Sequence, residues 1–234
     1  ILIFTLFEFF RMSWNKNIQP QLYTGTVLSV LLYSILFLFG QNILSVRILS
    51  LPALILLIVP IVEIFRKKEN AIQNITYTLT GIVLFAIPFS LFSLILIPFS
   101  NQPELYKPEI LIGMMVIIWA SDSGAYIFGS LIGKHKLAEK ISPNKTWEGT
   151  IGGTIFSIAI ALIYFSFFDY FNTIEIITIS LATIVAGTFG DLFESLIKRN
   201  FEVKDSGNIL PGHGGLYDRF DSLLFAAPVY YILI

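Results

Sequence analysis

Four carboxylates occur in two pairs, each with a spacing that a helix brings onto one face. Asp191 and Glu194 lie in GTFGDLFESLIKR, with Ser195 beside them, and Asp218 and Asp221 lie in LYDRFDS. Residues three or four apart share a helix face, so each pair projects from one side of its helix. Carboxylate oxygens are ligands that Mg²⁺ prefers. The two pairs therefore predict an oxygen-rich site for a divalent cation.

The segment between the two acid pairs carries cations and glycines. Cationic side chains bind phosphoryl oxygens through charge-assisted hydrogen bonds, and glycines let backbone N–H groups approach an anion closely at positive φ. His213 lies among the glycines, where it could donate to a phosphate, carry a proton or simply cap the loop. We expect phosphate binding by cations and glycines of this segment and by one arginine within the second pair: Lys198, Arg199, Lys204, Gly212, Gly214, Gly215 and Arg219.

A second basic loop, FGSLIGKHKLAEKISPNKTWEGTIGG, is not a P-loop. Only three residues separate Gly129 from Gly133, and a histidine follows the lysine. Ser142 followed by proline is instead typical of a helix N-cap, which predicts a helix N-terminus at residues 144–146. Lys145 would then meet an anion there. The other lysines of this loop could equally be solvated residues that obey the positive-inside rule.

Three further acids lie within apolar segments. An ionised group in a bilayer costs at least a few kcal/mol, so each is a candidate functional residue. Asp122, late in IIWASDSGAYIFG, is expected to form a polar wall of the site or to bind a second cation. Glu8 and Glu63 each stand alone near basic residues, so a salt bridge or a side chain reaching the interface is an equal alternative to a functional role.

The elements that position these residues are predicted by apolar runs. Of the 234 residues, 55% are hydrophobic and 13% are charged, far from the average of soluble domains. About 20 apolar residues cross a bilayer as a helix. Such runs lie near 22–40, 46–65, 75–98, 109–131, 150–168, 174–197 and 219–234, and residues 1–10 are expected to be part of a truncated eighth.

The fold class predicted is an all-α integral membrane protein, a polytopic helical bundle of about eight spans. Residues 1–108 would form the N-terminal transmembrane helices, and residues 109–234 the C-terminal transmembrane catalytic region. Together the two regions are expected to form one compact membrane domain. Glycines at 149 and 153 are spaced for close helix packing.

Loop charges predict the orientation of the spans. Under strict alternation, one set of loops holds 12 lysines and arginines, and the opposite set holds two, Arg47 and Lys107. The positive-inside rule places the first set in the cytoplasm, together with the candidate site. The cytoplasmic set is Arg11, Lys16, Arg66, Lys67, Lys68, Lys134, Lys136, Lys140, Lys145, Lys198, Arg199 and Lys204.

Composition excludes several classes of site. The chain has no cysteine and two histidines, which excludes thiolate zinc sites, iron–sulfur clusters and a thiol nucleophile. The net charge of −1 gives no indication of nucleic-acid binding.

The stretch SLIKRNFEVKDSGNILPGHGGLYDRFD, residues 195–221, resembles the signature of the phosphatidate cytidylyltransferase (CDP-diacylglycerol synthase) family. Upstream, SDSGAYIFG, GKHKLAEKISPNKTWEG and GDLFES also resemble that family, in the expected order. The resemblance covers the chain from about residue 109. The N-terminal half is similar only as a hydrophobic region of several spans.

The resemblance implies a dimeric membrane enzyme that converts CTP and phosphatidic acid to CDP-diacylglycerol and pyrophosphate with Mg²⁺, in phospholipid biosynthesis. It implies Asp191, Asp218 and Asp221 as metal ligands, and we expect Glu194 and Ser195 to support them. We expect the phosphates of the substrates to bind Lys145 and the four cations of the C-terminal segment, Lys198, Arg199, Lys204 and Arg219. If the source is bacterial, the expected location is the inner membrane. Two alternatives remain, a CTP-dependent lipid kinase and an ion-coupled transporter.

Overall fold

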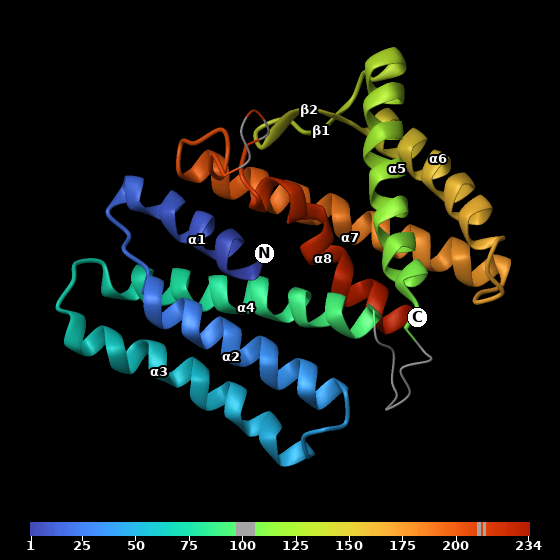
Figure 1. The fold of residues 1–234 in the computed structure, drawn as a ribbon. Coiled ribbons are helices and arrows are strands. Elements are labelled where there is room, and N and C mark those ends of the chain that lie inside the picture. Colours follow the sequence, from blue (N-terminus) through green and yellow to red (C-terminus); the bar gives the residue numbers. More distant parts are fainter. Residues whose placement is uncertain (97–105, 210–211, 213) are drawn as a thin grey trace. The chain divides into compact units, whose positions relative to one another are not determined.

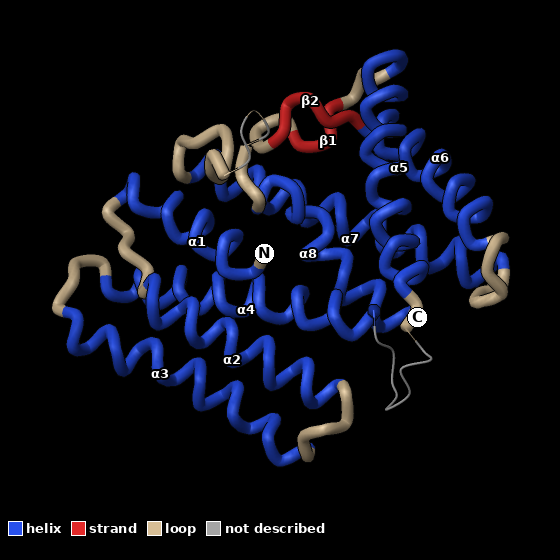
Figure 2. The backbone as a smooth tube through the Cα atoms, viewed as in Figure 1, coloured by secondary structure: helices blue, strands red, loops and turns tan. Residues whose placement is uncertain are grey.

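The computed structural model describes residues 1–96, 106–209, 212 and 214–234, and within them the chain is mainly helical (Figures 1 and 2). The elements are α1 (Leu2–Met12), η1 (Ser13–Lys16), α2 (Leu22–Gly40), η2 (Val46–Ser50), α3 (Leu51–Arg66), α4 (Ala71–Leu96), α5 (Pro108–Ile132), β1 (Lys136–Ala138), β2 (Ser142–Thr146), α6 (Trp147–Phe165), α7 (Thr173–Asn200) and α8 (Tyr217–Leu233).

The predicted class, an all-α polytopic membrane protein, is confirmed. Within the described residues, six helical segments are long and apolar enough to cross a membrane: α2, η2 with α3, α4, α5, α6 and α7. The helix α8 has 17 residues and α1 has 11, both shorter than the length of about 20 that a span needs. Within the described residues, each of the eight predicted runs nevertheless contains a helix.

The chain forms two units, the first from Ile1–Tyr106 with Lys198–Phe220 and the second from Lys107–Ile197 with Asp221–Ile234. The predicted boundary near residue 108 stays a prediction. In the first unit, α2, α3 and α4 lie side by side, and α1 packs on α2 and α4 (Figure 1). Their core contains Leu28, Leu32, Ile55, Val59, Ile82 and Ala86.

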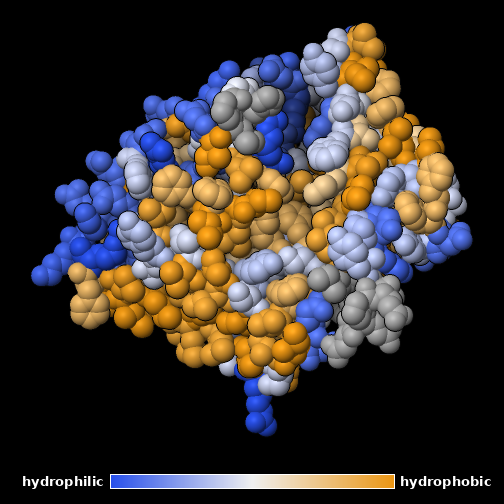
Figure 3. All heavy atoms as spheres, in the orientation of Figure 1, coloured by the Kyte–Doolittle hydropathy of each residue, from blue (hydrophilic) through white to orange (hydrophobic). Residues whose placement is uncertain are grey.

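The surface of the first unit separates apolar from polar residues. Figure 3 shows hydrophobic side chains over α2 and α3, and hydrophilic side chains at the end where the α1–α2 and α3–α4 loops lie. Exposed apolar residues such as Leu54, Leu57 and Ile61 on α3 suit lipid contact. At the polar end Glu63 is buried and bound by Arg66 at 2.7 Å, which confirms the salt-bridged alternative for this acid.

In the second unit, α5 and α6 pack closely through glycines, as predicted. A Cβ on Gly153 would lie 2.5 Å from the carbonyl oxygen of Ser121, and one on Gly149 would lie 2.7 Å from that of Ala125. Backbone atoms cannot move aside as the end of a side chain can. The hydroxyl of Ser157 also donates to the carbonyl of Ile117 at 2.6 Å, which ties the two helices together.

We expect Gly153→Ala to lower the free energy of unfolding by about 1–3 kcal/mol, because the added methyl group overpacks a backbone contact. Thermal unfolding in detergent would measure this change. Ile155→Ala, at a position on the same helix with 66% exposure, is the matched control and should change the melting temperature little. Equal melting temperatures for Gly153→Ala and the unaltered chain would contradict the packing described here.

Candidate active site

Three acids from two helices meet in the second unit. One carboxylate oxygen from each of Asp191, Glu194 and Asp221 lies within 4.8 Å of the other two. Gly190 permits this meeting, because a Cβ there would lie 2.5 Å from the carbonyl oxygen of Asp221. The helices α7 and α8 can therefore approach closely where the acids lie. Glu194 is buried, and Asp191 and Asp221 are half-buried.

The donor set and its spacing fit a divalent cation. Hard cations such as Mg²⁺ take oxygen ligands at about 2.1 Å, so oxygens on opposite sides of the ion lie about 4.2 Å apart. A separation of up to 4.8 Å is close to that value. The structure thus brings Asp191 and Asp221 together, with Glu194 as the third member, and their role as metal ligands stays a prediction.

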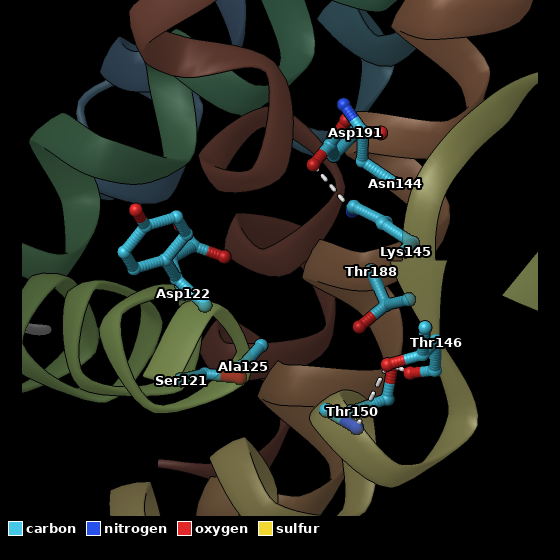
Figure 4. Close-up of a pocket in the computed structure, with 11 residues that line it drawn as sticks. Ser121, Asp122, Ala125, Asn144, Lys145, Thr146, Thr150, Thr188 and Asp191 are labelled. Atoms are coloured by element: carbon cyan, nitrogen blue, oxygen red, sulfur yellow. Dashed lines mark hydrogen bonds and ion pairs between the residues drawn. The ribbon is translucent and has the colours of Figure 1, made fainter. Parts of the chain in front are cut away.

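Beside the acid cluster lies a cavity of about 250 Å³ in the same unit. The ammonium of Lys145 forms an ion pair with Asp191, and Figure 4 shows the two side chains pointing toward one another. The hydroxyl of Ser195 donates to Asp191 at 3.3 Å. Asp122, from α5, lines the cavity, as expected for a polar wall. The cavity is lined by Ser121, Asp122, Ala125, Tyr126, Asn144, Lys145, Thr146, Gly149, Thr150, Thr188 and Asp191.

The predicted helix start at Ser142 is wrong. Residues 142–146 form strand β2, which pairs antiparallel with β1 in the register Lys136↔Thr146 and Ala138↔Ser142. The N-cap of α6 is Thr146, whose side chain accepts from the N–H of Gly149 at 3.2 Å. Hairpin pairing thus overrides the local Ser-Pro preference. Lys145 reaches the site from a strand, one residue before the cap.

Glu148 closes the loop that precedes β1. Its carboxylate accepts from the N–H groups of Lys134 and His135 at 3.1 Å, and it contacts the ring of His135 at 2.5 Å. The N–H of Trp147 in turn donates to the carbonyl of His135 at 2.9 Å. The segment that leads into β1 is therefore tied to the first turn of α6, and β2, which carries Lys145, runs directly into the same turn.

Asp218 lies in the first unit, where donors surround its carboxylate. Lys198 approaches Oδ1 at 2.9 Å, while the N–H of Gly215 at 2.8 Å and both the N–H and the hydroxyl of Ser206 at 3.0 Å approach Oδ2. The side chains of Lys198 and Asp218 are 17% and 12% exposed. Asp218, in the first turn of α8, thus binds two residues of the α7–α8 loop, the segment between the two helices (residues 201–216), and Lys198 at the end of α7. Its assignment as a metal ligand stays a prediction.

The expected glycine conformations are confirmed at two positions. Gly212 and Gly214 have φ values of 75° and 78°, in the region that side chains rarely adopt. His213 lies outside the described residues. Arg199, Lys204 and Arg219 are exposed, so their side chains are accessible to an anion, and their phosphate-binding role stays a prediction.

Three threonines of the cavity wall were not predicted from the sequence. Thr146, Thr150 and Thr188 line it with hydroxyl groups. Thr146 could have been found, because threonine directly before an apolar run is one of the residues preferred at an N-cap. Thr150 and Thr188 carry no such signal, since threonine is common in apolar helices.

Comparison with known proteins shows the family to which the chain belongs. The sequence profile of the cytidylyltransferase family matches residues 1–234, so the chain belongs to this family. Curated relatives are similar over a shorter stretch. The phosphatidate cytidylyltransferase of Staphylococcus saprophyticus is 54% identical over 123 residues, and those of Staphylococcus haemolyticus and Staphylococcus aureus (strain COL) are each 50% identical over 120 residues. Each aligned stretch covers 51% of this chain and 46% of the relative, about half the length of the curated relatives.

Proposed function

We propose that the chain transfers the cytidylyl group of CTP to phosphatidate, giving CDP-diacylglycerol and pyrophosphate. The observation that carries this proposal is the cluster of Asp191, Glu194 and Asp221 beside Lys145, in a membrane protein of the cytidylyltransferase family. Carboxylates for a cation and a lysine for an anion are the groups that a nucleoside triphosphate requires. The names of the curated relatives support phosphatidate as the acceptor.

We assign Asp191, Glu194 and Asp221 as the residues that would hold Mg²⁺, with Asp122 available for a second cation. The bound ion would neutralise charge on the triphosphate and polarise its phosphoryl oxygens. Ser195 donates to Asp191 and so orients that carboxylate. Family membership and the acid cluster support use of a divalent cation, and the all-oxygen donor set is compatible with Mg²⁺.

The reaction itself requires alignment and neutralisation of charge. An oxygen of the lipid phosphate forms a bond to the α-phosphorus of CTP, while the bond from that phosphorus to the bridging oxygen breaks and pyrophosphate leaves. The attacking oxygen is already anionic near pH 7, so a general base contributes little. We assign phosphate binding to five cations, Lys145, Lys198, Arg199, Lys204 and Arg219. We assign phosphate contact or proton transfer to His213.

We further propose that the site faces the cytoplasm. The 12 to 2 division of lysines and arginines between alternate loops supports this orientation. The cytoplasm is also the compartment that holds nucleotides. In a bacterial cell the membrane would be the inner membrane. The homodimer is part of the proposal through the family resemblance, and phosphatidic acid would enter the site from the bilayer.

Replacing Lys145 by alanine should raise the KM for CTP by about tenfold or more, because charge-assisted hydrogen bonds contribute roughly that factor. The KM for phosphatidate should change much less. Lys140→Ala, in the turn of the same hairpin, is the matched control and should behave like the unaltered chain. An unchanged KM for CTP in Lys145→Ala would remove this lysine from the nucleotide site.

Transfer of radioactive label from CTP into lipid by the purified chain tests the proposed function. Label at the α-phosphate should enter phosphatidate-derived lipid, and EDTA should abolish the transfer until excess Mg²⁺ is added. Entry of γ-label instead would indicate a CTP-dependent lipid kinase. Entry of neither label would reject nucleotide transfer and favour a transporter.

A further inference from the structure

Glu8 is an acid of α1 that lies far in sequence from the predicted site residues and yet binds the α7–α8 loop. Only 2% of the residue is exposed. Its Oε2 atom accepts from the N–H of Tyr217 at 2.8 Å and lies 3.3 Å from the hydroxyl of Ser206. The first N–H of α8 is thus held by a carboxylate some 209 residues earlier in the chain.

Ser206 connects Glu8 to Asp218. Its hydroxyl lies 3.0 Å from Oδ2 of Asp218, and its N–H donates to the same oxygen at 3.0 Å. A hydroxyl has one proton, so it can donate to only one of the two carboxylates at a time. A change at Glu8 therefore alters the hydrogen bond that Asp218 receives.

Two glycines of the loop pack closely against Glu8. A Cβ on Gly215 would lie 2.7 Å from Oε2 of Glu8, and one on Gly207 would lie 2.9 Å from its Cγ. Tyr217 is fixed on its other side by rings of the same unit, with centroids 6.1 Å from Phe9 and 5.1 Å from Phe85. Two glycines and a buried tyrosine thus fit around this carboxylate.

We propose that Glu8 is a positioning residue for the α7–α8 loop: it holds Tyr217 and Ser206 so that Asp218 keeps its contact with Lys198. The first helix then helps to hold a loop that carries part of the family signature, although the two lie at opposite ends of the chain. The effect on catalysis rests on the proposed function, whereas the effect on the loop does not.

Hydrogen exchange of the full chain in nanodiscs tests the loop directly. In Glu8→Ala, the amide of Tyr217 should exchange about tenfold or more faster, because its acceptor is gone. Glu8→Gln keeps a carbonyl acceptor and should restore exchange to within about threefold of the unaltered chain. Unchanged exchange at Tyr217 in Glu8→Ala would overturn the proposal.

Glu63→Gln is the matched control for a buried acid of the same unit. Its carboxylate binds Gln21, Asn74 and Arg66, each at 2.7–2.8 Å, and none of these lies in the α7–α8 loop. This variant should lower the melting temperature without changing exchange at Tyr217. Faster exchange at Tyr217 in this control would mean that any loss of stability opens the loop, and would also overturn the proposal.

Ser206→Ala keeps the test valid if Glu8→Ala fails to fold, since it removes one hydroxyl from a loop. We expect its kcat for cytidylyl transfer to fall about tenfold while the KM for CTP changes less than threefold, because the binding cations remain. Normal kcat in Ser206→Ala would contradict the link between Glu8 and Asp218. Absence of transfer by the unaltered chain would reject the proposed function, and the exchange result would still decide on Glu8.

Discussion

Replacing Asp191 by asparagine should lower the turnover of cytidylyl transfer by about 10³-fold, equivalent to about 4 kcal/mol of transition-state stabilisation. The substitution removes one charge from the acid cluster and breaks the ion pair with Lys145. Both the cation and the nucleotide phosphates would then lose a partner. Initial rates at saturating CTP and phosphatidate measure the effect.

Asp169→Asn is the matched control, because Asp169 is an exposed acid in the α6–α7 loop of the same unit. It carries the same change of charge and should leave turnover within about twofold of the unaltered chain, as surface substitutions usually do. If Asp191→Asn kept normal turnover while remaining folded, Asp191 would not belong to the reactive centre.

Replacing Asp218 by asparagine should lower turnover by about 10²-fold or more, while the protein still folds and inserts. Asparagine carries an NH₂ group where the carboxylate accepts from Lys198, Ser206 or Gly215. A donor would then face a donor, and the ammonium of Lys198 would lose its counter-charge. Turnover, together with melting temperature and gel-filtration profile, separates a catalytic effect from unfolding.

A double-mutant cycle with Lys198→Met tests whether the two residues act as one unit. The combined loss for Asp218→Asn and Lys198→Met should be clearly smaller than the product of the separate losses. Fully multiplicative losses would show that the contact at 2.9 Å has no catalytic consequence. Normal turnover in Asp218→Asn alone would remove Asp218 from the site.

The helices were the most predictable part of the molecule. Apolar runs long enough to cross a bilayer leave helix as the structure that satisfies every backbone group, so composition and length suffice. The predicted spans 22–40 and 109–131 agree closely with α2 and α5. The close packing at Gly149 and Gly153 was also predicted, because small residues four apart remove the side chains that would keep helices separate.

The hairpin was not predictable by the same reasoning. Ser142 and Pro143 have the local preference of a helix start, but pairing with residues 136–138 supplies backbone hydrogen bonds that a local pattern does not reveal. The position of Lys145 beside Asp191 therefore depends on tertiary structure. Lys145 nevertheless remains a candidate for anion binding, because that prediction depends on its charge and not only on the secondary structure around it.

The acids show where helical spacing is informative and where it is not. Asp191 and Glu194 were paired from their spacing of three, and both belong to the cluster. Glu8 was identified as an intramembrane acid but without a partner, because its partners Ser206 and Tyr217 lie about 200 residues away. A contact of that kind leaves no periodic pattern in one sequence.

Binding of Mn²⁺, measured by electron paramagnetic resonance, tests most directly whether Asp191, Glu194 and Asp221 hold a divalent cation. The full chain would be studied in phosphatidylcholine nanodiscs, whose zwitterionic lipid competes little for the ion. We predict that Asp191→Asn and Asp221→Asn each weaken Mn²⁺ binding at least tenfold, whereas Asp169→Asn binds like the unaltered chain. Equal Mn²⁺ affinity in all four proteins would contradict the assignment of the acid cluster as the metal site.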